Sequence, residues 1–358
     1  MRPSEKPWTG AAMGLGAAAL FGLTAPLSKP LLEETGPLVL AALLYLGGGI
    51  GLLVFGGARR ILALHGSKEA ALRRSDVPLL LGVVLTGGIV GPVLMLTGLE
   101  RLSALGTSLL LNLEAPFTIV MALLVFREHL GRRELVGAAA IVGGALLLAI
   151  RPGELRGDWI GVAALSGACL AWATDNNLTQ RLSLRDPVAV VVVKTLGAGG
   201  CMLAIALALG QRLPPAETTF VALLLGSAGY GLSIVLDLRA LRILGAAREA
   251  AYFATAPFLG ALASVVLLGD RLAPADWAGG AAMALGVWTL LRARHAHVHT
   301  HEALVHEHLH VHDEHHRHHH EGPVNEPHSH EHRHVPITHD HPHLSDLHHR
   351  HRHGPLRR

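Results

Sequence analysis

The chain is poor in cysteine, in aromatic residues and in charge. Its two cysteines, Cys169 and Cys201, lie inside apolar stretches, which excludes a disulfide scaffold and a cysteine metal knuckle. Aromatic residues make up 4% of the sequence, and no concentrated basic face accompanies them, which excludes a nucleic-acid binder. Charged residues make up 16%, against about 25% in an average soluble domain, so the composition argues against an ordinary soluble globule.

Apolar residues are abundant instead, at 50% of the 358 residues. They form runs of the length that a membrane-spanning helix needs, about 17–25 residues. The predicted spans are 10–28, 37–57, 77–98, 104–126, 135–150, 159–178, 187–209, 219–237, 248–268 and 275–291. Backbone polar groups inside lipid must bond within their own segment, and the runs lack the strict alternation of a barrel strand. The sequence therefore predicts an all-α membrane protein with ten transmembrane helices.

Lysine and arginine are distributed unequally between alternate loops. With the N-terminus inside, the inner loops carry 17 of them and the outer loops carry 6. Because positive residues favour the cytoplasmic side, we expect both termini in the cytoplasm and the spans in the inner or plasma membrane. Arg2 and Lys6 would also suit a cleaved signal peptide, but the repeat described next requires the first span.

The two halves of the apolar region can be laid on each other. The matched residues are Trp8 and Trp159, Phe21 and Trp172, Ala115-Pro116-Phe117 and Ala256-Pro257-Phe258, Glu128 and Asp270, Leu130 and Leu272, Gly137 and Gly279, and Gly144 and Gly286, at spacings of 151, 141 and 142. An odd number of spans per copy forces the second copy into the opposite orientation, as in many secondary transporters. The predicted domains are 1–150 and 151–294, one five-helix repeat each, followed by a tail at 295–358.

These residues resemble the EamA-type members of the drug/metabolite transporter superfamily over about residues 8–292. The resemblance is carried by Ala18-Ala19-Leu20-Phe21-Gly22, by Ala171-Trp172-Ala173, and by the two Ala-Pro-Phe helices, each followed by an acidic-x-Leu turn and a glycine-rich last span. It implies ten helices, cytoplasmic termini and transport of small organic solutes. The family pattern does not include the tail and does not fix a substrate.

Two ionisable residues lie deep within predicted spans, where such residues usually face the bundle interior or an aqueous path. Glu114 stands beside Asn112 and two residues before Pro116. It either binds a cationic solute or a coupling proton, or it forms an internal salt bridge with Lys194. Lys194, within a run of valines, should be paired or have a depressed pKa.

A polar cluster, Asp175-Asn176-Asn177, follows the sixth apolar run. It either lines the inner mouth of the path or caps the end of that helix. Pro116 and Pro257 are expected to kink their helices, and because they are duplicated, hinges for alternating access are a second reading. The predicted translocation path therefore consists of Glu114, Asn112, Lys194, Asp175, Asn176 and Asn177, with hinges at Pro116 and Pro257.

The tail holds 24 of the 26 histidines and almost no large apolar residues. No core can form from it, so we expect it to be disordered. Neutral imidazoles are good ligands for Zn²⁺, Ni²⁺, Co²⁺ and Cu²⁺. The predicted metal ligands are His306, His308, His310, His312, His315, His316, His318, His319, His320, His328, His330, His332 and His334. Two H-E-x-x-H matches, at His306 and His330, are expected by chance in such a tract, so a metalloprotease is not predicted.

The main hypothesis is a secondary transporter that moves a small solute between the two halves, with proton coupling as an option. One alternative is a divalent-metal exporter whose tail loads or senses the ion. Another is a membrane-anchored metal buffer that transports nothing. No enzyme activity, required cofactor or nucleic-acid partner is expected. The sequence leaves the solute, the direction of transport, the coupling ion and the oligomeric state open.

Overall fold

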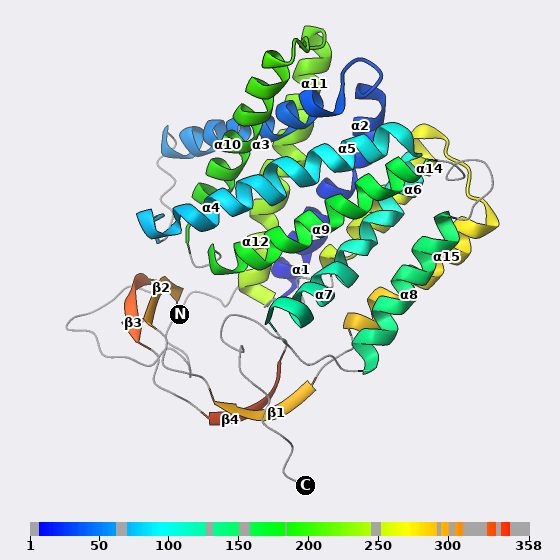
Figure 1. The fold of residues 1–358 in the computed structure, drawn as a ribbon. Helices are drawn as coiled ribbons and strands as arrows, with labels where there is room; N and C mark the ends of the chain where they lie inside the picture. Colours follow the sequence, from blue (N-terminus) through cyan, green and yellow to red (C-terminus); the bar gives the residue numbers. More distant parts are fainter. Residues whose placement is uncertain are drawn as a thin grey trace.

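The structure is a computed structural model of the whole chain, and it describes residues 7–61, 70–126, 132–149, 158–182, 185–244, 252–291, 295–300, 305–310, 328–333 and 338–343. Within these ranges the first 291 residues form helices packed side by side, and the four strands come later in the chain (Figure 1).

The first half of the chain folds as helices that follow the predicted spans. They are α1 (Pro7–Gly22), α2 (Thr24–Leu31), α3 (Pro37–Ile61), η1 (Arg74–Asp76), α4 (Val77–Val83), η2 (Val84–Val90), α5 (Gly91–Arg101), α6 (Ala104–Leu110), η3 (Leu111–Leu113), α7 (Glu114–Phe126) and α8 (Arg132–Ala149). Segment η2 is a π-helix that joins α4 to α5. Segment η3 is a 3₁₀ turn that joins α6 to α7.

The second half repeats this order. Its helices are α9 (Trp159–Leu182), α10 (Pro187–Ala208), α11 (Ala216–Gly226), η4 (Ser227–Leu232), α12 (Ser233–Leu244), α14 (Ala256–Leu268) and α15 (Pro274–Leu291). Segment η4 is again a π-helix, and it joins α11 to α12. Asp158 begins α9 by accepting a hydrogen bond from the Gly161 N–H at 2.9 Å, which holds the pKa of that carboxyl below its usual value.

Each of the ten predicted spans overlaps helix in the described residues. Long apolar helices, by length and composition sufficient to cross a membrane, are Trp8–Leu31, Pro37–Gly56, Arg74–Arg101, Pro187–Ala208 and Ala216–Ala240. Shorter apolar helices occupy Leu135–Leu147 and Ala256–Leu268. The all-α membrane fold is confirmed, while ten crossings stay a prediction.

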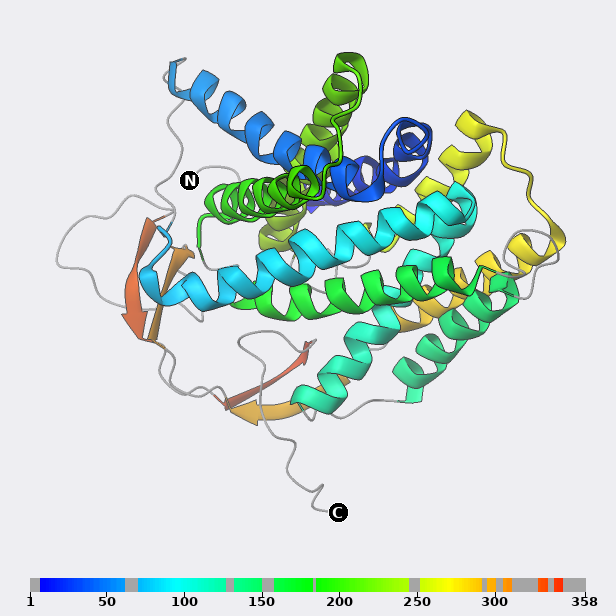
Figure 2. The ribbon, with the colours of Figure 1, turned by 45° about the horizontal axis from the view of Figure 1, so that its top comes forward.

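Helix α8 packs along α15, its counterpart in the other half, through glycines that the sequence comparison had matched. A Cβ added at Gly144 would lie 2.6 Å from the Gly279 carbonyl oxygen, and one added at Gly286 would lie 2.6 Å from the Gly137 carbonyl oxygen. Gly286 and Gly137 are the counterparts of Gly144 and Gly279, so the two contacts are equivalent, as a two-fold relation requires. Figures 1 and 2 place this pair, the glycine seam, at the side of the bundle away from α3 and α10.

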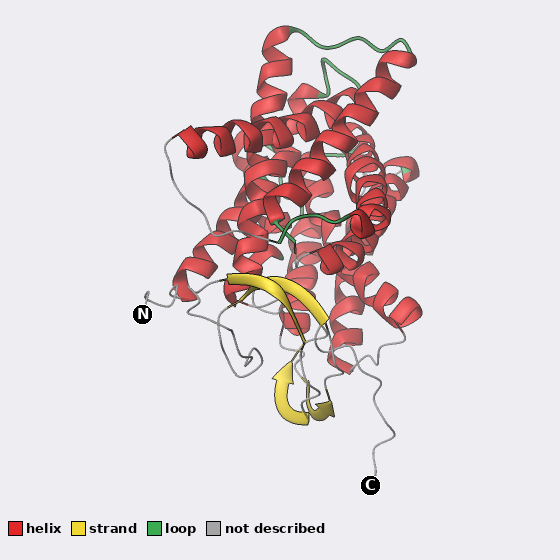
Figure 3. Cartoon of the chain, turned by 90° about the vertical axis from the view of Figure 1, so that its left-hand side faces the viewer, coloured by secondary structure: helices red, strands yellow, loops and turns green. Residues whose placement is uncertain are grey.

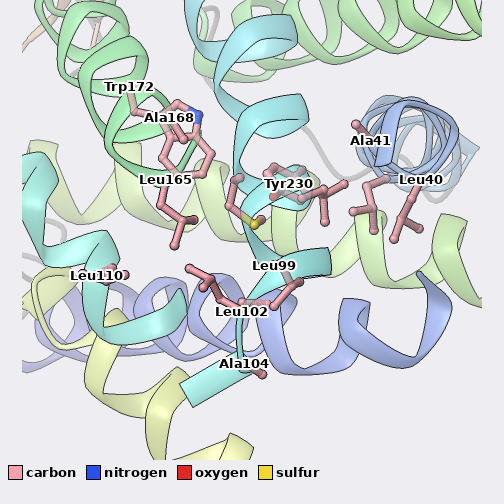
Figure 4. Packing of buried hydrophobic residues seen from close by; sticks show 14 of the residues in the cluster. Leu40, Ala41, Leu99, Leu102, Ala104, Leu110, Leu165, Ala168, Trp172 and Tyr230 are labelled. Atoms are coloured by element: carbon pink, nitrogen blue, oxygen red, sulfur yellow. The ribbon is translucent and has the colours of Figure 1, made fainter. Parts of the chain in front are cut away.

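Helices α3 and α10, which are counterparts in the two halves, also pack through two equivalent contacts. Gly49 packs on Leu196, and Gly199 packs on Leu46, with a spacing of 150 residues between each residue and its counterpart. Helix α9 is the counterpart of α1, and α5 is the counterpart of α12. The α1/α12 contact therefore corresponds to the α5/α9 contact. Between these helices lies the main apolar core, in which Leu165 and Trp172 of α9 lie toward Leu99 of α5 (Figure 4). The bundle is thus built as two matched halves around a shared core.

The two π-helical segments, η2 and η4, lie at matched places in the third helix of each half. Gly87 in η2 and Gly229 in η4 are 142 residues apart, the spacing that also relates Gly137 to Gly279. A π-bulge inserts an extra residue into a helical turn and occurs often at functional sites. Neither π-segment was predicted from the sequence.

In the tail, the structure differs from the prediction of disorder over the described residues. Strand β1 (His295–Thr300) pairs antiparallel with β4 (Thr338–His343), and β2 (Val305–His310) pairs with β3 (His328–Arg333). Histidine at every second position has the period of a strand, which explains why these segments are extended without an apolar core. Figure 3 shows the strands gathered at one end of the helical bundle.

The predicted metal ligands divide between described and undescribed residues. Those in β2 and β3 are His306, His308, His310, His328, His330 and His332. Those outside the described residues are His312, His315, His316, His318, His319, His320 and His334.

Candidate functional site

Asp175 and Lys194 form a buried ion pair between α9 and α10. The Lys194 Nζ lies 2.6 Å from the Asp175 Oδ2, and the two residues are 8% and 5% exposed. A lysine this deep requires a partner, as the sequence predicted. That partner is Asp175 rather than Glu114, so the alternative in which Glu114 forms a salt bridge with Lys194 was wrong.

Glu114 instead accepts a hydrogen bond from a neutral amide. The Asn176 Nδ2 donates to the Glu114 Oε1 at 2.6 Å, joining the first residue of α7 to α9. Glu114 is half-buried and Asn176 is exposed. Within the described residues the Glu114 carboxylate forms no ion pair, which leaves it able to accept a proton or a cationic group.

Asp175, Asn176 and Asn177 do not end their helix, because α9 continues to Leu182. The prediction that this cluster caps the end of the helix was therefore wrong. Asp175 and Asn176 contact other helices, while Asn177 donates to the Ala173 carbonyl of its own helix at 2.8 Å. Asn112 is likewise occupied, because its Nδ2 donates to the Leu109 carbonyl at 2.9 Å.

Pro116 and Pro257 each stand in the first turn of a helix rather than in the middle of one. Pro116 is the third residue of α7, directly after the 3₁₀ segment η3, and Pro257 is the second residue of α14, after a turn at residues 254–255. A proline in the first turn loses no intrahelical bond, so both residues mark breaks between helical segments.

The Gly87 carbonyl in η2 receives two side-chain donors from different halves. The Tyr45 hydroxyl donates to it at 2.6 Å, and the Trp172 Nε1 donates to it at 3.2 Å. A Cβ at Gly87 would overlap the Asp175 carboxylate, so this glycine is needed for the ion pair to sit against the π-helix. Tyr45 and Gly87 are site residues that the sequence did not predict, since only a glycine pair within a span marks the place.

Aromatic side chains gather beside this carbonyl, although the chain has few of them. The Phe21 ring lies 5.9 Å from Trp172, 6.0 Å from Tyr230 and 5.4 Å from Phe253, and the Tyr45 and Tyr230 rings are 4.7 Å apart. Phe21 and Trp172 were matched in the sequence comparison, and their direct contact places them where the two halves meet. We call these five residues the aromatic cluster.

None of the charged residues of the site, Glu114, Asp175 and Lys194, is duplicated in the opposite half. Gly229 in η4 packs on Thr24 as Gly87 packs on Asp175, and Thr24 precedes Asp175 by the same 151 residues that separate Phe21 from Trp172. Thr24 therefore holds the place of Asp175 in the other half. By the spacings of their own helices, Leu44 holds the place of Lys194, and Thr255 holds that of Glu114.

The described helices offer no ready metal site. No group of three or more His, Cys, Asp and Glu residues is placed to hold an ion among the residues that the structure describes. The candidate site is thus a set of one ion pair, one carboxylate with an amide partner, and the aromatic cluster.

A bundle of long apolar helices in two matched halves, with charged residues buried between them, defines a multi-pass helical membrane protein. The model of the EamA-like transporter family matches residues 8–150 and 159–292, and the chain belongs to that family. Membership makes it a membrane transporter and points away from an enzyme.

The proteins similar to the chain include the following two. One is an "uncharacterized transporter" of Methanothermobacter thermautotrophicus, 30% identical over 292 residues, with 76% of this chain and 83% of the relative covered. The other is a solved crystal structure, 19% identical with a TM-score of 0.60, covering 79% of this chain and 98% of that one. The crystal structure supports the fold alone.

Proposed function

We propose that the chain moves a small solute across the membrane by alternating access, along a path between the two halves that runs past Glu114 and Asn176. The observation that carries this proposal is the asymmetry of the site. Asp175 and Lys194 of the second half stand where the first half has Thr24 and Leu44. Glu114 of the first half stands where the second half has Thr255. Because the fold tolerates neutral residues at the matched places, the charged ones are retained for another role.

Glu114 binds the proton or the cationic group of the solute in this mechanism. Its carboxylate has a neutral partner at 2.6 Å, and Lys194 is already held by Asp175. A carboxylate without a counter-ion in a low-dielectric site gains most from an arriving positive charge. Asn176 orients the carboxylate and meets the solute beside it.

The Asp175–Lys194 pair and the aromatic cluster close the path in the present conformation. Lys194 and Asp175 are buried together, and Tyr45, Tyr230 and Trp172 are each less than 10% exposed. Asn112 and Asn177, whose amides are bound to their own helices, contribute to the shape of the path rather than to solute recognition.

Movement of the halves takes place at the duplicated irregular segments. The π-segment η4 contacts α1 and α3, and η2 contacts the matched helices of the other half, α9 and α10. Shifts between π- and α-helical turns change the rotation of a helix without unfolding it. The breaks before Pro116 and Pro257 supply a second matched pair of flexing points, in keeping with rocking of repeats about a midplane site.

We place the chain in the inner or plasma membrane with both termini in the cytoplasm, on the loop charges given above. Labelling with an impermeant maleimide tests this orientation. Ser4→Cys should react only from the cytoplasmic side, and Gln211→Cys in the opposite loop only from outside, in a Cys201→Ser background. Reaction of both from the same side contradicts the orientation.

A ligand screen followed by one substitution tests transport. Purified protein, with and without residues 295–358, is screened by thermal shift against amino acids, nucleosides, polyamines and sugars, and a stabilising compound is assayed for uptake into proteoliposomes. Glu114→Gln should abolish uptake and leave the unfolding temperature nearly unchanged. Glu217→Gln, the same change at an exposed carboxylate, is the control. Wild-type uptake by Glu114→Gln removes this residue from the mechanism.

A further inference from the structure

The strand register of the tail sets histidine opposite histidine. In the β1/β4 ladder the opposed positions are His295 and His343, His297 and His341, and His299 and His339. In the β2/β3 ladder they are His306 and His332, His308 and His330, and His310 and His328. All twelve histidines of the four strands are thus paired across a ladder.

These pairs fall on one face of each ladder. Directly opposed residues share a face, and so do residues two apart along a strand. Each ladder therefore carries six histidine positions on one face, while its other face carries mixed residues such as the opposed pair Glu307 and Glu331. The arrangement follows from register and period together, since a shift of one residue would set histidine against a non-histidine.

We propose that each ladder binds a divalent transition-metal ion of the Zn²⁺ or Ni²⁺ class, one at β1/β4 and one at β2/β3. Opposed Cβ atoms in an antiparallel ladder lie about 4.5–5.5 Å apart, which lets two imidazoles share an ion with bonds of about 2.0–2.1 Å. Two neighbouring pairs supply four nitrogens. An all-imidazole set selects Zn²⁺, Ni²⁺, Co²⁺ and Cu²⁺ over Mg²⁺ and Ca²⁺, which prefer oxygen.

The proposal adds the β1/β4 histidines, none of which is among the ligands that the sequence predicted. Metal binding commonly orders the site that it occupies, so ion binding should tighten the ladders. Protons compete for neutral imidazole, so binding strengthens as the pH rises through about 6.5.

Ion counting on the full-length protein in detergent tests the proposal. The protein is dialysed against Zn²⁺ alone, and bound metal is measured by mass spectrometry. Replacing His306, His308 and His310 by Asn should remove one of the two tight ions, and replacing His295, His297 and His299 should remove the other. The matched control replaces His315, His316 and His318, which lie outside the described strands, and should retain both ions. Equal losses in all three variants, or no loss in any, overturn the ladder sites.

A cross-linking pair tests the register itself. His297→Cys with His341→Cys places cysteines at opposed positions, and a disulfide should form with a yield that rises when Zn²⁺ is added. His295→Cys with His339→Cys lies four positions out of register and is the control. Equal yields for the two pairs contradict the register, and a yield that Zn²⁺ does not change contradicts tightening by metal. Solute transport plays no part in either experiment, so failure here leaves the proposed function intact.

Discussion

The glycine seam of α8 and α15 and the polar site of α7, α9 and α10 treat the internal repeat in opposite ways. In the seam, Gly144 meets Gly279 and Gly286 meets Gly137, so both halves supply the same residue type at the same contact. In the polar site, Asp175 and Lys194 stand at positions that Thr24 and Leu44 occupy in the other half. The two halves thus have the same residue types at the helix contacts that build the bundle. They have different residue types at the positions where one half carries a charge.

This difference distinguishes the residues that build the bundle from the residues that we assign to transport. A close contact between helices in lipid depends on small residues and serves either half equally. A buried charge destabilises the bundle unless it is paired, so its presence in only one half requires a separate benefit. The following experiments change one region at a time and compare the outcome with the other.

Breaking the buried ion pair should have the largest effect. Lys194→Leu alone leaves Asp175 unpaired and should lower the free energy of unfolding by about 3–5 kcal/mol. The double variant Asp175→Thr with Lys194→Leu copies Thr24 and Leu44, and it should regain most of the lost stability without regaining transport. Thermal unfolding in detergent and uptake assays measure the two properties separately. If the double variant transports normally, the asymmetry has no functional meaning.

Alanine in the glycine seam should have an intermediate effect, and the same effect in both halves. Gly144→Ala and Gly286→Ala each push a Cβ against a carbonyl oxygen at 2.6 Å, which should lower stability by about 1–3 kcal/mol. Gly143→Ala meets nothing within 4 Å and is the control. Transport per folded molecule should stay at the wild-type level. Unequal losses for the two seam variants would contradict the two-fold relation.

Alanine in the π-segments should affect transport more in one half than in the other. Gly87→Ala displaces the Asp175 carboxylate, whereas Gly229→Ala displaces only the methyl group of Thr24. We expect Gly87→Ala to reduce the uptake rate strongly and Gly229→Ala to reduce it mildly. Uptake rates normalised to reconstituted protein measure the ratio. Equal reductions would mean that both segments act only as structural joints.

Removing the tail should have the smallest effect on the bundle. Deletion of 295–358 touches neither the seam nor the polar site, so the free energy of unfolding should change by no more than about 0.5 kcal/mol. Tight metal binding should be lost at the same time. A large drop in the unfolding temperature without added metal would show that the tail supports the helices.

Sequence patterns predicted the parts of the fold that depend on period and duplication. The spans overlap helices, and the matched residues Phe21 and Trp172 contact each other between the halves. The matched glycines contact crosswise, Gly144 with Gly279 and Gly286 with Gly137. Residues that map onto each other and also lie near the two-fold axis must meet there. Span length and spacing carry this information directly.

The choice of partners within the site was not predictable in the same way. The sequence offered Lys194 as a partner for Glu114, but Lys194 pairs with Asp175 and Glu114 bonds to Asn176. The rotation of each helix about its axis decides which side chains meet, and span order does not reveal that rotation. Each π-segment adds one residue to a helical turn and so changes the rotation of the helix that follows it. No residue type or spacing in the sequence indicates where such a segment occurs. In the tail, the lack of apolar residues predicted disorder. The histidines at every second position, a period that favours strands, indicated the extended segments instead.

The central claim is that Glu114 and Asn176 line an aqueous path between the halves rather than a lipid-facing groove. Labelling of Asn176→Cys in a Cys201→Ser background tests it, with Cys169 left in place because it is buried. A charged, membrane-impermeant thiol reagent should modify the new cysteine from at least one side of the membrane, and a bound solute should slow the reaction. Reaction with a lipid-soluble maleimide alone, and with no charged reagent from either side, would contradict the claim.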